Sequence, residues 1–221
     1  MRQLLCFGDS NTWGYDPKTG QRFAWGIRWT SILQEKLRTD YVHVIEEGLC
    51  GRTTVFEDIH RAGRCGIDVL PHLLEIYDPI DSIVVMLGTN DCKAAYHTDE
   101  NRIGAGLEKL VQIIQKKQPH AKILLLSPIY LGEEVWKENY DPEFDKNAVE
   151  VSHRLKEVYQ IIAKKYGVHF LAASDYATFS KDDQEHMDEK NHEKLANAIY
   201  NKIRSMEQVA SRVTEQFANV S

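Results

Sequence analysis

The sequence predicts an α/β fold in which a doubly wound, five-stranded parallel sheet carries helices on both faces. Two observations predict it: short β-rich runs alternate with amphipathic helical stretches, and two of these runs are continuously apolar. A continuously apolar strand suits a sheet that is covered on both faces. The length of 221 residues and the hydrophobic share of 43% fit one compact domain with a core of its own.

Five strands are expected, at residues 3–7, 41–45, 82–87, 122–126 and 168–171. The third and fourth contain the continuously apolar runs, so we expect them in the middle of the sheet.

Helices are expected after each strand, because apolar residues recur there at the spacing of one helix face. These apolar stripes begin at Trp29, Leu70, Ile103, Leu155 and Leu195. The chain is therefore expected to contain five repeats of strand and helix.

Two loops and the C-terminal tail are additional to these five repeats of strand and helix. The connections 15–27 and 130–145 are long for an α/β protein, and such loops usually serve function or an interface. Residues 1–204 are expected to form the main domain, with 205–221 as a helical extension of it. The tail carries an apolar stripe that can dock on this domain or on a second subunit, formed by Val209, Val213 and Phe217.

The charge balance argues against two classes of partner. The chain has 27 Lys and Arg against 33 Asp and Glu, and a net charge of −6 has the wrong sign for phosphate backbones or anionic lipid. We therefore expect no nucleic-acid or membrane partner. The sequence has no run of roughly 18 apolar residues and no adequate signal-peptide core, so a cytoplasmic protein is expected. The four cysteines lack Cys-x-x-Cys spacing and are expected to be free thiols.

A serine follows the first expected strand. Gly8 and Asp9 precede it, which places Ser10 in a tight turn at the carboxyl edge of the sheet, where a helical segment begins. Active sites of doubly wound sheets lie beyond this edge, and backbone N–H groups at a helix start are available to a carbonyl under attack. The alternative is a helix cap without chemistry, because Asp and Ser are preferred caps.

A base for this serine is available near the other end of the chain. An Asp three residues before a His can accept the Nδ1 proton while Nε2 faces the nucleophile, which makes Asp183 and His186 a candidate pair. Asp182, Asp188 and His192 are the nearby competitors. An ordinary surface pair of Asp and His is the alternative.

Two further turns offer hydrogen-bond donors to an oxyanion. Gly51 follows the second strand and lets the backbone approach a ligand closely, and Asn90 follows the third strand with a side-chain amide. The alternative for each is an ordinary turn, because Gly, Asn and Asp are common in turns.

Together, these four motifs are a more specific signal of function than any one of them alone. They follow each other along the chain as Gly8-Asp9-Ser10, Gly51, Gly88-Thr89-Asn90-Asp91 and Asp183-x-x-His186. In this order the chain resembles the SGNH or GDSL family of ester hydrolases over residues 3–204. The segments 6–14, 45–54 and 86–93 are especially similar to the mycobacterial arylesterase and acyltransferase branch.

The resemblance implies a flavodoxin-like three-layer sandwich and a role for each matching residue. Ser10 would be the nucleophile, His186 the general base and then acid, and Asp183 its orienting carboxylate. The oxyanion hole would consist of the backbone N–H groups of Ser10 and Gly51 and the side-chain amide of Asn90. The resemblance implies no cofactor and no metal.

The chain departs from the family between the catalytic acid and base. The family often has a hydrophobic residue or glycine where this chain has Gln184 and Glu185. A carboxylate at Glu185 raises the pKa of His186 if it faces inward, but a solvated side chain is the expectation.

Two rival chemistries use other residues of the same region. Cys50 and Cys92 lie beside the expected oxyanion donors, which formally allows a Cys-His hydrolase, although neither has an obvious base partner. His186 and His192 are six residues apart, unlike the His-x-x-x-His of a zinc helix.

The predicted function is a serine ester hydrolase of carboxylesterase or arylesterase type, acting on small short-chain acyl esters through an acyl-serine intermediate. The resembling branch also implies acyl transfer to alcohols and a homo-oligomer. The expected substrate pocket contains Asp9, Asn11, Trp13 and Trp25. The alternatives are a carbohydrate O-acetyl esterase or thioesterase with the same triad, and a catalytically silent ligand-binding protein.

Overall fold

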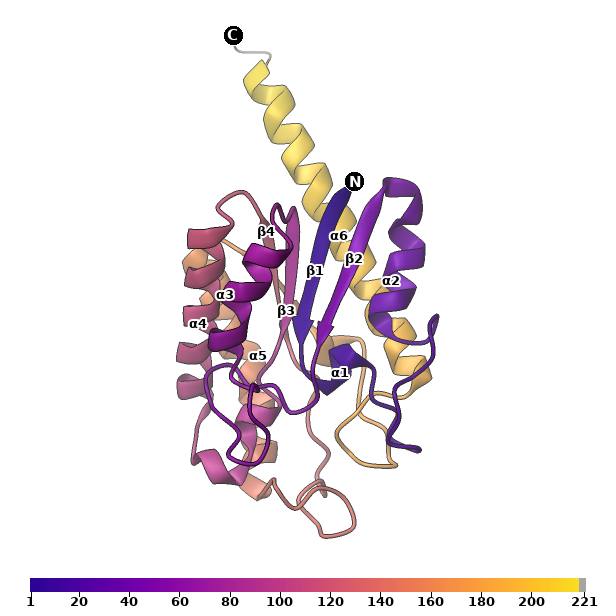
Figure 1. The fold of residues 1–221 in the computed structure, drawn as a ribbon, viewed down its shortest axis with the longest axis vertical. Helices are drawn as coiled ribbons and strands as arrows, with labels where there is room; N and C mark the ends of the chain where they lie inside the picture. The colour runs from indigo at the N-terminus through magenta and orange to yellow at the C-terminus, as the bar shows by residue number, and fades with distance from the viewer. Residues whose placement is uncertain (219–221) are drawn as a thin grey trace.

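A five-stranded, fully parallel sheet forms the centre of the protein, in the strand order β2-β1-β3-β4-β5 (Figure 1). The computed structural model describes the backbone of residues 1–218 and the side chains of residues 1–208. This arrangement confirms the predicted fold class. The strands are β1 (Arg2–Gly8), β2 (Val42–Gly48), β3 (Ser82–Met86), β4 (Lys122–Ser127) and β5 (His169–Ala172).

The two continuously apolar runs lie inside the sheet, as predicted. They form β3, which is the central strand, and β4, which lies between β3 and β5. All but the first residue of each of these strands is buried. The reason is that helices cover both faces, so neither set of alternating side chains reaches water.

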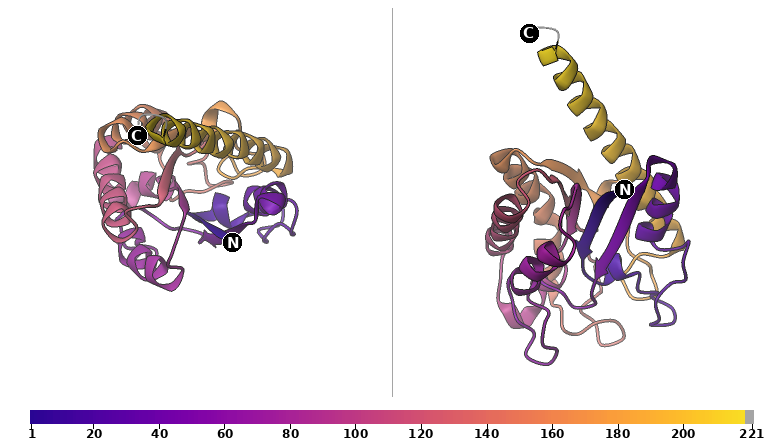
Figure 2. Two further views of the ribbon diagram at one scale, coloured as in Figure 1. Left: turned by 90° about the horizontal axis from the view of Figure 1, so that it is seen from above. Right: turned by 45° about the horizontal axis from the view of Figure 1, so that its top comes forward.

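Helices cover the two faces of the sheet unequally. The helices α3 (Gly66–Ile76), α4 (Glu100–Lys117) and α5 (Lys146–Tyr166) pack on one face, and α2 (Trp29–Leu37) and α6 (Glu189–Ala218) on the other (Figure 2). The predicted apolar stripes lie in the two resulting cores: Leu70, Ile103 and Leu155 in one, Trp29 and Leu195 in the other.

The last helix, α6, continues without a break across position 204, where the C-terminal extension is predicted to begin. The side chains of Val209, Val213 and Phe217 lie outside the described residues, so docking of this stripe stays a prediction. Within the described part of the chain, no helix combines the length and apolarity that crossing a bilayer requires.

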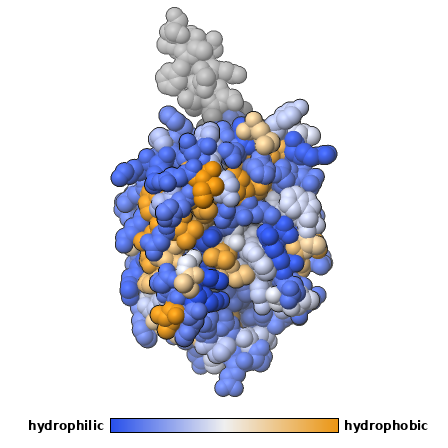
Figure 3. Space-filling view, viewed as in Figure 1, coloured by the Kyte–Doolittle hydropathy of each residue, from blue (hydrophilic) through white to orange (hydrophobic). Residues whose placement is uncertain are grey.

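One face of the surface is mostly hydrophilic. Figure 3 shows this face, on which hydrophobic residues gather on the side where α3 covers the sheet. Ile76 at the end of α3 is 68% exposed. The homo-oligomer stays a prediction.

The carboxyl ends of the five strands point to one edge of the molecule. In Figure 1 the arrowheads are directed downward, toward the short helix α1 (Ser10–Trp13) and the long connecting loops. Since β1 and β3 are neighbours, residues that follow these two strands are brought close together at this edge.

Candidate active site

A pocket of about 240 Å³ opens at the carboxyl edge of the sheet. It brings together five residues that the sequence predicts for the site: Ser10, Gly51, Asn90, Asp183 and His186. Its remaining lining residues are Tyr15, Cys50, Arg61, Lys93, Tyr140, Asp141, Glu143 and Glu185.

Ser10 is placed by the end of β1 and the start of α1. Asp9 caps this helix, because its Oδ1 accepts the backbone N–H of Asn11 at 3.0 Å. Ser10 is therefore the first helical residue rather than the cap, and its hydroxyl is free for other contacts. The backbone of Trp13 packs so closely on β2 that a Cβ on Gly48 would lie 2.1 Å from the Trp13 nitrogen, so only glycine fits there.

Ser10, His186 and Asp183 form a continuous chain of contacts. The Ser10 Oγ lies 2.8 Å from Nε2 of His186, and Nδ1 of His186 lies 2.6 Å from Oδ2 of Asp183. The other carboxylate oxygen of Asp183 accepts the backbone N–H groups of Glu185 at 3.0 Å and of His186 at 2.9 Å. One carboxylate thus fixes the turn and the orientation of the imidazole.

The competing residues have other partners. Asp182 accepts the Ser180 hydroxyl at 2.8 Å, and Asp188 accepts the backbone N–H of Asn191 at 2.9 Å at the start of α6. The Nδ1 of His192 accepts the backbone N–H of Trp29 at 3.3 Å. None of the three touches Ser10.

The charges around His186 stabilise its protonated form. Burial lowers the pKa of His186, but the charges of Glu185 and Asp183 and the hydrogen bond to Asp183 outweigh it, so the pKa is raised. Burial would raise the pKa of Asp183, yet the hydrogen bond and charge of His186 lower it below its usual range. The ring of Tyr15 lies against the imidazole, with the centroids 4.2 Å apart. His186 is therefore held on several sides.

Donors for an oxyanion border the same pocket. Gly51 has a φ of +83°, a left-handed conformation that favours glycine, and a Cβ there would lie 2.9 Å from the Arg61 guanidinium. The Asn90 side chain is buried, and its Nδ2 donates one hydrogen to the carbonyl of Arg52 at 3.2 Å. The second hydrogen of this amide remains for another acceptor.

The four residues expected in the substrate pocket do not line it. Asp9 and Asn11 are buried beside Ser10, and Asn11 Oδ1 accepts the backbone N–H of Met187 at 3.0 Å, which ties the serine turn to the histidine turn. Burial raises the pKa of Asp9 to about 7.

The two tryptophans lie outside the pocket as well, which corrects the prediction. Trp25 is 56% exposed, with the Arg28 guanidinium 5.7 Å from its ring centre. Trp13 is half-buried and carries the Arg22 guanidinium 5.5 Å from its ring centre. Each of the two rings thus has an arginine over its face, and neither lines the pocket.

Charged and aromatic residues that the sequence analysis did not select form the pocket mouth. Arg61 pairs with Asp58 at 2.8 Å, and Lys93 forms an ion pair with Glu143. Tyr140, Asp141 and Glu143 come from the 130–145 loop, whose length was the one signal that pointed to them.

Glu185 is buried rather than solvated, which corrects the expectation for this residue. Its side chain is 6% exposed, and Oε1 lies 3.7 Å from Nε2 of His186. The pKa of Glu185 is raised, mainly by burial. The signal for this position was its place directly before the histidine.

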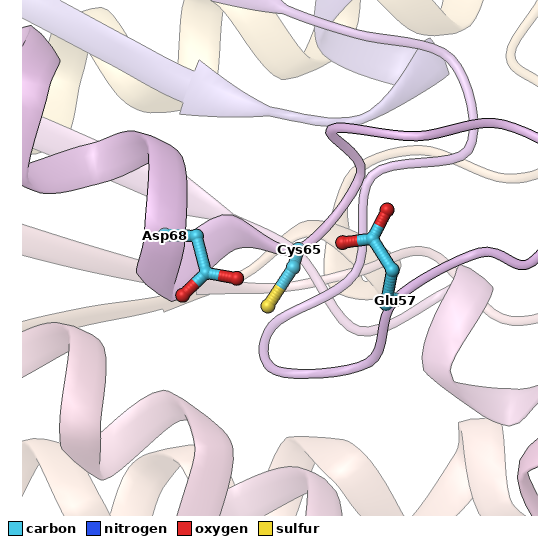
Figure 4. A group of neighbouring side chains, drawn as sticks. All are labelled: Glu57, Cys65 and Asp68. Atoms are coloured by element: carbon cyan, nitrogen blue, oxygen red, sulfur yellow. The ribbon is translucent and has the colours of Figure 1, made fainter.

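The pKa values of the cysteines argue against a Cys-His hydrolase. Burial raises the pKa of Cys50 to about 11 and that of Cys92 well above its ordinary value, so neither thiol is activated. Burial lowers the pKa of His192 to about 3. Among the described residues, one group has the makings of a metal site, Glu57, Cys65 and Asp68, and it is not part of the pocket lining (Figure 4).

The comparisons with known proteins agree with this geometry. The model of the GDSL-like lipase/acylhydrolase family matches residues 6–194. The chain belongs to this family. The order of the motifs predicted this family, whose members are carboxylic ester hydrolases. The protein is therefore an esterase of the SGNH type.

Solved structures of the same fold include a carbohydrate acetylesterase family member and an aryl esterase. A carbohydrate acetylesterase family member from Sinorhizobium meliloti is 33% identical, with a TM-score of 0.87 over 93% of this chain and 99% of the other. The native aryl esterase of M. smegmatis is 32% identical, with a TM-score of 0.85 over 93% and 99% of the two chains. No curated protein sequence matches the chain.

Proposed function

We propose that this esterase cleaves esters of short acyl chains through an acyl-serine intermediate, with Ser10 as nucleophile, His186 as base and Asp183 as orienting carboxylate. The single observation that carries the proposal is the unbroken contact from Ser10 Oγ to His186 Nε2 at 2.8 Å and from His186 Nδ1 to Asp183 at 2.6 Å, inside a pocket. A serine hydroxyl is inert at neutral pH without such a base.

The reaction proceeds in two halves. His186 takes the Ser10 proton as Oγ attacks the ester carbonyl, and the oxyanion is bound by the N–H groups of Ser10 and Gly51 and by Asn90. His186 then returns the proton to the departing alcohol. In the second half, water or another alcohol attacks the acyl-serine, and His186 acts as base again.

The size of the pocket supports a small acyl group. A volume of about 240 Å³ is below the roughly 300 to 1,000 Å³ of pockets that hold drug-sized ligands. Acetyl esters are therefore the proposed substrates. The proposal has no role for Trp13 or Trp25, since neither lines the pocket.

A carbohydrate O-acetyl ester is the second candidate. The observation that favours it is the polar pocket mouth, where Arg61, Lys93, Asp141 and Glu143 offer hydrogen-bond partners to a polyhydroxylated alcohol. The Sinorhizobium meliloti structure described above is named a carbohydrate acetylesterase family member.

We also propose acyl transfer to alcohols, a homo-oligomer and a cytoplasmic location. The free state of the four cysteines supports a reducing compartment, and the family branch that the motifs resemble supports transfer and assembly.

The test is release of p-nitrophenol from p-nitrophenyl acetate, butyrate and octanoate by the protein and its Ser10→Ala variant. We expect release that falls with acyl length and is lost in the variant. Equal rates in both proteins would contradict the role of Ser10, and a maximum at octanoate would contradict the short acyl chain.

A further inference from the structure

Glu185 lines the pocket next to the catalytic histidine but has no part in the reaction as described. The side chain of Glu185 is buried against the imidazole, with Oε1 3.7 Å from Nε2 of His186. It forms no hydrogen bond with any residue whose side chain the structure describes, although it lines the pocket. The contact with His186 is an ion pair only when the imidazole is protonated, and a buried carboxylate that lacks a hydrogen-bond donor is costly, so a donor supplied from the pocket is expected to bind it.

The second half of the reaction brings such a donor to this place. The attacking water must direct one hydrogen to Nε2 of His186, and its second hydrogen then needs an acceptor. Two acceptors that share one water lie roughly 4 to 4.5 Å apart at ideal geometry. The separation of 3.7 Å between Glu185 Oε1 and Nε2 is close to this value and needs only a small side-chain adjustment.

We propose that Glu185 positions the deacylating water by accepting its second hydrogen, and that it thereby favours water over alcohols as the acyl acceptor. The inference rests on the proposed acyl-serine mechanism. An alcohol has one hydroxyl hydrogen, which His186 must receive. It therefore leaves Glu185 without a donor and places its carbon substituent against a buried carboxylate.

Deacylation by water passes through a tetrahedral intermediate. The water oxygen bonds to the acyl carbon, one of its protons moves to Nε2, and the hydrogen held by Glu185 stays on the new hydroxyl group. The tetrahedral intermediate then collapses, the bond to Ser10 Oγ breaks, and His186 returns its proton to Oγ. The product is the free acid, and Glu185 is unchanged.

The charge state of Glu185 matters, because an ionised carboxylate is the stronger acceptor. Burial raises the pKa of Glu185, the charges of Asp141 and Asp183 add to this, and His186 and Lys93 oppose it. The assay is therefore run at mildly alkaline pH, which favours the ionised form.

The experiment measures how one acyl-enzyme divides between two acceptors. The protein is given p-nitrophenyl acetate in water that contains 1-propanol, and propyl acetate and acetate are quantified. We expect Glu185→Leu to raise the ratio of propyl acetate to acetate by about tenfold or more, the value of one charged hydrogen bond. Glu185→Gln, which keeps a neutral acceptor, is expected to raise it less.

Glu157→Gln is the matched control, because it removes an equal charge at an exposed position of α5 that does not line the pocket. Its ratio is expected to stay at the wild-type value. A ratio in Glu185→Leu within twofold of wild type would overturn the inference, as would an equal rise in the control. Absence of Ser10-dependent p-nitrophenol release in the wild type would instead contradict the proposed function itself.

Discussion

The Asn90 amide offers the sharpest test of the oxyanion site. Its Nδ2 donates to the carbonyl of Arg52 at 3.2 Å, which holds the amide in place before substrate arrives. The side chain is buried and lines the pocket. Asn90→Ala removes one of three proposed donors without touching Ser10 or His186.

The expected loss follows from the role of a preorganised donor. Removing one such group costs about 100- to 1,000-fold in kcat, or about 2.7 to 4 kcal/mol of transition-state stabilisation. KM is expected to change little, because the negative charge develops only in the transition state. The steady-state hydrolysis of p-nitrophenyl acetate measures both constants.

Asn90→Ala is also expected to lower the folding stability, which must be measured separately from kcat. The Arg52 carbonyl loses its donor from Asn90, which costs about 1 to 3 kcal/mol of folding stability. Urea unfolding of the variant measures this loss. Asn101→Ala on the exposed side of α4 is the control, with full activity expected. A folded Asn90→Ala protein with a kcat within threefold of wild type would exclude Asn90 as an oxyanion donor.

Three further predictions concern protonation and packing. Because the pKa of His186 is raised and the neutral ring is the base, kcat/KM is expected to rise with pH through a midpoint above 6.5. Asp183→Asn should lower that midpoint and reduce kcat by about 10,000-fold. An unchanged pH profile in this variant would argue against the pair of Asp183 and His186. Burial raises the pKa of Asp9 from 3.8 to about 7, so the folded protein keeps a proton that the unfolded chain loses between these values. This group therefore makes stability fall as pH rises through that window, and urea unfolding at pH 5 and pH 8 should show a larger fall in wild type than in Asp9→Asn. Tyr159→Phe removes the hydroxyl that donates to the Leu87 carbonyl at 2.5 Å, and thermal or urea unfolding should show a loss of about 1 to 3 kcal/mol; an unchanged stability would contradict this.

The parts of the fold that the sequence predicts are those set by local pattern. The apolar runs of β3 and β4 and the helix stripes follow from burial on both faces of the sheet. Asp183 and His186 were identifiable because one turn holds both, and the topology of the sheet then brings Ser10 to them.

The parts that it did not predict depend on contacts between distant segments. Glu185 was expected in solvent, but the turn that aims His186 at Ser10 also directs its neighbour into the pocket. Arg61 and Lys93 line the pocket, and both pair with Glu143 from a loop far along the chain, which no local spacing reveals. Trp25 was expected in the substrate pocket, but its ring lies beside the Arg28 guanidinium and does not line the pocket.

Covalent capture with a phosphonate identifies the nucleophile itself. A p-nitrophenyl alkylphosphonate reacts with an activated serine by forming a bond from Oγ to phosphorus while p-nitrophenolate leaves. Intact-mass measurement and peptide mapping of the treated protein are expected to show one phosphonyl group, on Ser10, and none on the Ser10→Ala and His186→Ala variants. An unmodified wild-type protein, or a phosphonyl group on another residue, would contradict the account.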